Sequence, residues 1–319
     1  MKTYLILIVF FVCSAQAQYS YILERHGGAR KAGETNGFRF TVMKNGVQAY
    51  TVERSLPFDV PYPLVSLNNT TGVSVLRFVF DGIAEVYDNS GRKAWDRNFF
   101  RGEEVNYERV IGCVIGEHAV HFLLSDSHRE KAVVESYSLT GTLRWKSILP
   151  HQFAYDIAMS PDERAIIAGS YLALEDEVRR SARFLDNNGA ATGDIDIIFR
   201  KAVFTVNTAL IALASEREVV VVSGETKKEI ARIRTQTGGI ITDLIWKDNS
   251  LLVQESNVVT PNDGRYHYAD PTMITYSPEL KTISTKKLEG LEFRESELRR
   301  RDRSIELILD KEKSVIVVE

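Results

Sequence analysis

Cysteine, proline and an excess of charge of one sign are all scarce in this sequence. The 319 residues include two cysteines and eight prolines, and 40 lysines and arginines stand against 43 aspartates and glutamates. The net charge of −3 provides no overall attraction to nucleic acid or to an anionic membrane, so no nucleic-acid partner is expected. Hydrophobic residues make up 44% of the chain, which is enough for a substantial core and excludes a disordered, collagen-like or low-complexity protein.

Long hydrophobic runs are absent except for one near the N-terminus. Lys2 gives this end a positive charge, residues 4–13 are apolar, and the Ala-Gln-Ala stretch that ends at Ala17 has the small residues that signal peptidase requires. A helix needs about 20 apolar residues to cross a bilayer, so this shorter run does not predict a transmembrane segment. We expect a signal peptide over residues 1–17, cleaved between Ala17 and Gln18, and a mature protein that is secreted or periplasmic.

Removal of this signal peptide would leave Cys113 as the only cysteine, so no intramolecular disulfide would form. Cys113 lies in an apolar run over residues 110–115, which is typical of a buried strand rather than of a reactive thiol. Val12 stands before Cys13, where a lipoprotein has a small residue, and this does not favour lipidation. Stability must therefore come from core packing.

Short runs rich in β-branched and aromatic residues recur along the chain, whereas sustained helical periodicity is scarce. Such runs, bounded by Gly, Asn, Asp or Ser, are typical of short antiparallel strands. They cover residues 38–43, 73–80, 133–137, 164–168, 218–222, 251–254 and 314–318. The sequence therefore predicts an all-β protein, with an N-terminal segment over residues 18–37 and a single domain over residues 38–319.

A glycine turn followed four residues later by a large residue repeats through this domain. In the two best copies Gly91 precedes Trp95 and Gly141 precedes Trp145, with a tyrosine and a polar turn before each glycine. Weaker copies place further turns near residues 46, 189, 226 and 280. A turn every 37–54 residues matches the length of a four-stranded antiparallel sheet in a repeat protein.

The six turns predict a six-bladed β-propeller. A single sheet cannot cover both of its faces, but sheets stacked around an axis cover one another. In this prediction the strands over residues 304–310 and 314–318 form the first half of one blade, and two strands within residues 38–53 form its second half. Both termini would then close the ring and remove an exposed edge. Seven blades are the alternative, if residues 19–24 and the stretch near residue 290 belong to a further unit.

Residues 88–95 and 138–145 carry the pattern Asp/Ser-x-x-Gly-x-x-x-Trp. They resemble the outer hairpins of pyrroloquinoline-quinone-like, tryptophan-aspartate-repeat-like and related secreted β-propellers. The resemblance covers residues 38–319 loosely and these two blades closely, and it implies the propeller fold. Quinone-dependent dehydrogenases of that superfamily need a vicinal cysteine pair, which a mature chain with Cys113 alone lacks. Their activity and cofactor are therefore not implied.

Propellers usually bind ligands on the face that carries the loops between blades and between the second and third strands. The longest such loop is predicted over residues 257–271, and loops of this length in compact domains are usually functional. The alternative is a surface insertion whose tyrosines pack against the adjacent blade. A loop over residues 174–180 carries charges of both signs, which is typical of a solvated turn. The candidate ligand-binding residues are Arg265, Tyr266, His267, Tyr268 and Asp270, together with His128 and Arg129 from the loop over residues 126–131.

No motif in the sequence fixes a catalytic site. His118 and His121 would point to opposite faces of a strand, and no metal site is predicted. The sequence favours a non-catalytic, monomeric propeller that binds an extracellular or periplasmic protein, peptide or carbohydrate without a cofactor. The alternative is a calcium-dependent propeller hydrolase or lyase, with its site in the central channel and its metal ligands drawn from several inner strands. Candidate calcium ligands are Glu117, Asp156, Asn207 and Asp243.

Overall fold

The computed structural model consists of β-strands throughout the part of the chain that it describes. It describes residues 18–26, 33–57, 60–79, 81–99, 108–126, 131–235, 239–260, 267–301, 304–310 and 313–318. No helix occurs among these residues, so the predicted all-β class is confirmed and nothing in them forms a helix that could span a membrane. The predicted signal peptide lies outside the described residues.

The strands form seven antiparallel sheets in which successive strands of the sequence pair with one another. The first sheet contains β1 (Tyr19–His26), β2 (Thr35–Lys44) and β3 (Val47–Pro57). The second contains β4 (Leu64–Leu67), β5 (Ser74–Phe78), β6 (Ile83–Tyr87) and β7 (Lys93–Asn98). The third contains β8 (Glu108–Ile115), β9 (Ala119–Asp126), β10 (Val133–Ser138) and β11 (Leu143–Ile148).

The remaining four sheets follow the same order along the chain. The fourth contains β12 (Phe153–Met159), β13 (Ile166–Ala173), β14 (Val178–Leu185) and β15 (Ala191–Ile195). The fifth contains β16 (Lys201–Phe204), β17 (Leu210–Ala214), β18 (Glu218–Ser223) and β19 (Glu229–Arg234). The sixth contains β20 (Ile240–Lys247), β21 (Ser250–Val259), β22 (His267–Tyr276) and β23 (Thr282–Lys287), with β24 (Glu292–Phe293) paired to β22. The seventh contains β25 (Ser296–Arg301), β26 (Ser304–Leu309) and β27 (Lys313–Val318).

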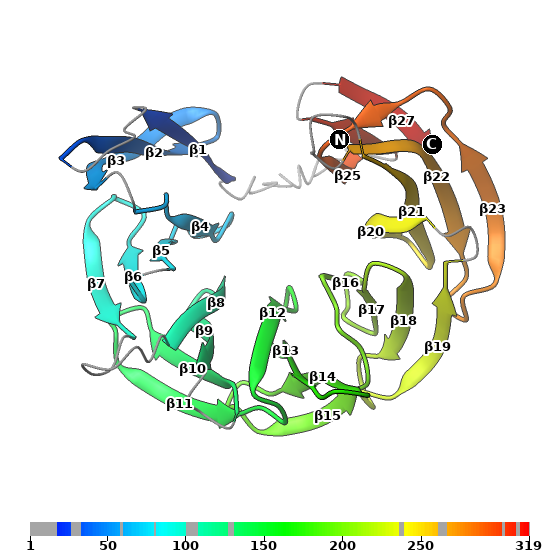
Figure 1. Ribbon diagram of the computed structural model, residues 1–319, viewed down its shortest axis with the longest axis horizontal. Coiled ribbons are helices and arrows are strands. Elements are labelled where there is room, and N and C mark those ends of the chain that lie inside the picture. Colours follow the sequence, from blue (N-terminus) through cyan, green and yellow to red (C-terminus); the bar gives the residue numbers. More distant parts are fainter. Residues whose placement is uncertain are drawn as a thin grey trace, which may run out of the picture.

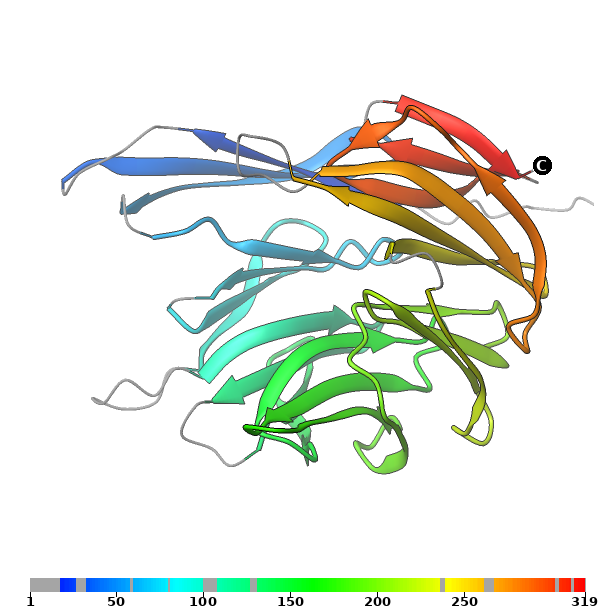
Figure 2. The same ribbon diagram turned by 45° about the vertical axis from the view of Figure 1, so that its right-hand side comes forward.

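The seven sheets follow one another around a central axis, from β1–β3 in blue to β25–β27 in red (Figure 1). In each four-stranded sheet the first strand lies toward the axis and the fourth lies on the rim. The sheets stack face against face (Figure 2). Among the described residues each pair of consecutive sheets encloses one buried apolar cluster, which places the core between the sheets rather than inside any one of them.

The prediction of six blades is wrong, because the structure has seven sheets. The six predicted turns all occur between the last two strands of a sheet, from β2–β3 to β22–β23. The seventh sheet ends at β27, its third strand, and so lacks the turn on which the prediction was based. The number of sheets agrees with the alternative of seven blades, and residues 19–24, which that alternative named, lie in β1.

The predicted blade shared by both termini is not confirmed. Among the described strands β26 pairs with β25 and β27, and β2 pairs with β1 and β3, in two separate three-stranded sheets. The N-terminal segment contributes β1, which pairs with β2 over its whole length. The amide of Tyr19 also donates a hydrogen bond to the carbonyl of Asn69 (2.8 Å), which joins the first sheet to the second.

The glycine-tryptophan repeat holds neighbouring sheets together. The indole Nε1 of Trp95 donates to the carbonyl of Leu139 (3.0 Å) in the turn of the next sheet. Gly141 in that turn has φ +88°, and a Cβ added there would lie 2.9 Å from Cγ of Trp95. Only glycine tolerates both conditions, so each tryptophan rests on the glycine turn of the following sheet. Trp145 and Gly189 repeat this contact one sheet further on.

Candidate binding site

One end of the ring, which we call the loop face, carries the connections between sheets and the turns between second and third strands. The amide of Thr235 donates to the carbonyl of Arg217 (2.9 Å), and the amide of Ile241 donates to the carbonyl of Glu216 (2.7 Å). The connection between β19 and β20 therefore lies across the turn between β17 and β18. This crossing fixes the side chains that the fifth and sixth sheets present to the loop face.

The predicted loop over residues 257–271 is mostly a hairpin. β21 continues to Val259 and β22 begins at His267, and these two residues are paired in the ladder. β24 pairs with the start of β22 and supports the hairpin from its other side. The β-branched and aromatic residues at both ends of the segment favour continued strand pairing over a free loop.

The predicted site residues that are described divide between a pocket and a structural role. The ring of Tyr268 packs against that of Phe293 at a centroid distance of 5.7 Å and also lines a pocket. Asp270 has φ +48° and its Oδ1 accepts the amide of Gly290 (2.8 Å), so it holds the connection after β23 in place. Arg265, Tyr266, His128 and Arg129 lie outside the described residues.

The pocket beside Tyr268, which we call the Asp243 pocket, has a volume of about 420 Å³. It lies where the inner strands β16, β20 and β25 meet the loop face. Arg294 on its lining donates from Nε to Nε2 of His267 (3.2 Å), which connects the predicted His267 to this pocket. The lining also includes Arg200, Lys201, Ile240, Ile241 and Asp243.

Asp243 is 3% exposed and joins three sheets. Its Oδ1 pairs with the ammonium group of Lys201 and accepts the amide of Leu244 (2.7 Å), while its Oδ2 accepts the amide of Leu298 in β25 (2.6 Å). Both oxygens are therefore occupied by donors from the fifth, sixth and seventh sheets. The carboxylate fixes the walls of the pocket and does not offer a free base.

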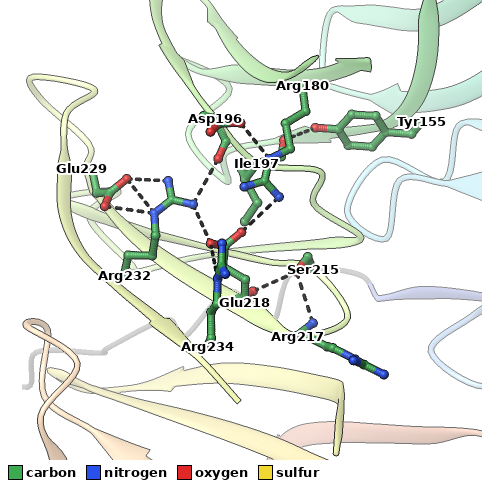
Figure 3. Close-up of polar contacts among 10 residues, drawn as sticks. All are labelled: Tyr155, Arg180, Asp196, Ile197, Ser215, Arg217, Glu218, Glu229, Arg232 and Arg234. Carbon is green, nitrogen blue, oxygen red and sulfur yellow. Dashed lines mark hydrogen bonds and ion pairs between the residues drawn. The ribbon is translucent and has the colours of Figure 1, made fainter. Parts of the chain in front are cut away.

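A second pocket, which we call the Glu218 pocket, adjoins the first at Ser215 and has a volume of about 390 Å³. Glu218 is 3% exposed and begins β18. Its oxygens lie 2.8 Å from Nη1 of Arg232, 3.3 Å from Nη1 of Arg180 and 3.6 Å from Nε of Arg234. Figure 3 shows these arginines converging on Glu218 from β14 and β19.

Two of these arginines are held by further carboxylates. Arg232 pairs with Glu229 (Nη2 to Oε2, 2.6 Å), and the hydrogen bonds that it donates to Glu229 and to the buried Glu218 raise its pKa. Arg180 pairs with Asp196 (Nε to Oδ1, 2.7 Å). Arg217 is different, because no ion pair joins it to any residue in the described part of the chain, and Figure 3 shows it pointing away from the network. Both pockets thus have rigid walls, and Arg217 lies beside them with free donors.

The sequence matches no known family model and no curated protein. Among solved structures the chain is similar to the Dos1 propeller, with a TM-score of 0.58 and 12% identity over 88% of this chain and 72% of that chain. It is also similar to the C-terminal WD40 domain of Sif2, with a TM-score of 0.58 and 10% identity over 89% and 77% of the two chains. The fold is that of a β-propeller. A chain of the mitotic checkpoint complex gives a TM-score of 0.54 and 12% identity over 88% and 84%.

The sequence alone did not single out most of the residues that line the Glu218 pocket. It noted Arg180 only as part of a charged loop and did not single out Arg217, Glu218 or Arg234. One signal was available, because Arg232 and Arg234 alternate along a strand and therefore share a face. The glutamate that opens the preceding strand is the natural partner for such a pair.

The four candidate calcium ligands have separate structural contacts. Oδ1 of Asn207 accepts the hydroxyl of Thr205 (3.0 Å) and the amide of Ala209 (3.1 Å) within one turn. Oδ1 of Asp156 accepts the amide of Ile157 (2.8 Å). The amide of Glu117 donates to Oε1 of Glu163 (2.5 Å) in the fourth sheet, and the oxygens of Asp243 accept the donors from three sheets described above. The part of the propeller that is described contains no group of three or more His, Cys, Asp and Glu residues placed to hold a metal ion.

Proposed function

We propose that this propeller is a non-catalytic binding protein that is exported and holds its partner on the loop face. The observation that supports the proposal most strongly is the pair of pockets that adjoin at Ser215. Four successive sheets, the fourth to the seventh, build them, and their charged walls are fixed by hydrogen bonds and ion pairs. A fixed, charged, concave surface on the loop side suits recognition of a partner.

The buried carboxylates of the two pockets favour binding over catalysis. Asp243 accepts from Lys201 and two backbone amides, and Glu218 accepts from arginines on two strands. A catalytic base or nucleophile needs a free lone pair within reach of substrate. These two carboxylates use theirs to hold the propeller together.

The predicted signal peptide over residues 1–17 supports export, and the expected partner is therefore an extracellular or periplasmic protein, peptide or carbohydrate. Export is tested by expressing the full chain in a secreting host and measuring the intact mass of the released protein. The expected N-terminus is Gln18. A chain that keeps residues 1–17 and stays in the cytoplasm would contradict export and leave the binding proposal to its own test.

Binding on the loop face is tested with a photo-crosslinking amino acid at two matched positions. Glu216 lies in the turn between β17 and β18, beside both pockets, and Glu279 lies in the turn between β22 and β23 at the other end of a sheet. Irradiation in the native secretory compartment should give a discrete crosslinked partner from position 216 and none from position 279. Equal yields from both positions, or a partner from position 279 alone, would contradict the proposal.

A further inference from the structure

We propose that the Glu218 pocket recognises a carboxylate side chain of an acidic peptide, which Arg217 and Arg234 would hold. This inference rests on the proposed function, because it specifies what binds on the loop face. It arises from a feature that binding in general does not require, namely arginine side chains that the ion pairs of the pocket leave incompletely used.

Backbone hydrogen bonds fix the positions from which the two arginine side chains extend. The amide of Arg217 donates to Oγ of Ser215 (3.2 Å), and the Ser215 hydroxyl donates to the carbonyl of Glu218 (3.4 Å), so the turn between β17 and β18 is closed on itself. The amide of Thr235 then donates to the carbonyl of Arg217 (2.9 Å), which places Arg234 next to this turn. The two side chains therefore start from backbone positions that are fixed relative to each other before any ligand arrives.

The charges of the arginines and carboxylates around Glu218 do not balance. The four arginines and three carboxylates of Figure 3 leave a net charge of +1. Arg180 and Arg232 are each held by two carboxylates. Arg234 contacts Glu218 through Nε alone at 3.6 Å and its side chain is 77% exposed, and Arg217 makes no ion pair with a described residue. The unmatched positive charge and the free N–H donors therefore lie on Arg217 and Arg234, which both line the Glu218 pocket, and the exposed Arg217 side chain would turn from its direction in Figure 3 to share a ligand with Arg234.

A carboxylate is the chemical group that matches these free donors. A guanidinium group presents parallel N–H donors that match the two oxygens of a carboxylate, which makes arginine the preferred partner of that group. Glu218 already pairs with Arg180 and Arg232, so an incoming carboxylate held by Arg217 and Arg234 would not have to displace it. A single carboxylate would cancel the net charge of the network and take up the donors that Arg217 and Arg234 leave free.

The lining of the neighbouring pocket favours a peptide over a carbohydrate. The neighbouring Asp243 pocket offers Ile240 and Ile241 as apolar lining, and Tyr268 is the one aromatic residue among the described residues that line it. The ring of Tyr268 packs against Phe293, so less of its face is available for stacking on a sugar ring. An apolar side chain that follows the acidic residue in an extended peptide would contact Ile240 and Ile241 in the Asp243 pocket, and the reduced aromatic surface gives a sugar ring less to stack on.

The test uses two fluorescein-labelled heptapeptides, Gly-Ser-Glu-Glu-Leu-Ser-Gly and the same sequence with glutamine in place of both glutamates. Fluorescence anisotropy with the mature protein should give at least tenfold tighter binding of the glutamate peptide at low salt, and the difference should shrink as sodium chloride is added. The double variant Arg217→Gln/Arg234→Gln should lose this preference. The control Arg92→Gln/Arg144→Gln removes two exposed arginines of the opposite face and should keep it.

Three results would overturn the proposal. These are equal affinity for the two peptides, an unchanged preference in the Arg217→Gln/Arg234→Gln variant, and tighter binding of trigalacturonate, a carboxylated sugar, than of the glutamate peptide. Both replaced arginines are exposed, so the variant should fold, and its melting temperature confirms this. Crosslinking from position 216 separates the two levels: a partner found there while the peptide preference is absent would contradict the acidic peptide and leave loop-face binding supported.

Discussion

At the scale of single residues, two buried titratable groups have pKa values shifted in opposite directions. Burial raises the pKa of Asp156 to about 6, against a partial lowering by the amide of Ile157 and by Arg77. Burial also lowers the pKa of His121 to about 4, and the positive charge of Arg144 adds to this. Both side chains therefore favour the neutral form in the folded protein.

These shifts predict opposite contributions to stability across the same pH range. Between pH 4 and 6 the folded protein holds a proton on Asp156 that the unfolded chain has released, so the contribution of Asp156 falls as the pH rises. His121 is neutral in the folded protein while the unfolded chain is protonated, so its contribution rises between pH 4 and 6.5. Each effect should amount to about 2 kcal/mol.

Urea unfolding at several pH values measures both contributions against two variants. The stability of the wild type relative to Asp156→Asn should fall from pH 4 to 6, and its stability relative to His121→Asn should rise over this range. Loss of the stacking between His121 and Trp145 destabilises the variant at every pH, which raises the second difference by a constant amount and does not change its slope. Flat differences with pH would show that these two groups keep ordinary pKa values.

At the scale of the element, a large side chain on one sheet meets a small residue in the turn of the next. Tyr50 rests on Gly91 in the same way that Trp95 rests on Gly141. The fourth sheet reverses the sizes, because the position of the large residue is Gly193 and the left-handed turn position of the fifth sheet is Lys227, with φ +56°. In both arrangements a large side chain meets a glycine between neighbouring sheets, but the sheets that supply the two residues are exchanged.

The sequence made the repeat visible where this pairing uses tryptophan and glycine, and it placed the turns of six sheets. It did not predict the seventh sheet, because that sheet has no last turn. It also placed a loop where β21 and β22 continue as a hairpin, since apolar residues in a polar segment look the same in a loop and in an edge ladder. Asp243 and Leu298 illustrate the remaining difficulty, because residues 55 positions apart meet only after three sheets have stacked.

Replacement of Gly141 by alanine should destabilise the propeller by about 3 kcal/mol, because the new Cβ meets both an unfavourable φ and the ring of Trp95. Gly46 is the matched control. It occupies the corresponding turn of the first sheet with φ +79° and has no atom within 4 Å of its added Cβ. Gly46→Ala should therefore cost only about 1 kcal/mol. Equal losses for the two variants in urea unfolding would remove the tryptophan contact from the account.

The reversed pair predicts a rescue between neighbouring sheets. A Cβ added at Gly193 would lie 2.6 Å from Cβ of Lys227, so Gly193→Ala should cost about 1–2 kcal/mol. In the Lys227→Gly background that contact is gone, and the same replacement should cost less than about 0.5 kcal/mol. A double-mutant cycle measures the coupling. Additive losses would mean that the two sheets accommodate each other elsewhere.

At the scale of the whole molecule, seven sheets place residues from distant parts of the sequence on one face. The Glu218 pocket takes side chains from β14, β18 and β19, and the Asp243 pocket takes them from β16, β20 and β25. No local motif records such a site, which explains why the sequence predicted the face but not the arginines and carboxylates that form it.

Calcium should not stabilise this molecule, because the side-chain oxygens of Asp156, Asn207 and Asp243 already accept hydrogen bonds from protein donors. A ligand that binds only the folded state raises the melting temperature, and the rise grows with the logarithm of ligand concentration above Kd. We therefore expect melting curves in millimolar calcium and in excess chelator to agree within about 1 °C. A rise of several degrees in calcium, reversed by chelator, would favour the calcium-dependent hydrolase or lyase instead.

The central claim is that a seven-sheet propeller binds its partner on the face that carries the two pockets. Amide hydrogen exchange with and without the crosslinked partner, once that partner is purified, tests this claim most directly. Protection should concentrate in the segments 214–217 and 239–242. These segments line the pockets, and the hydrogen bonds between the turn after β17 and the connection after β19 fix their positions. Protection confined to the opposite turns, at residues 88–91, 138–141 and 277–281, would contradict it.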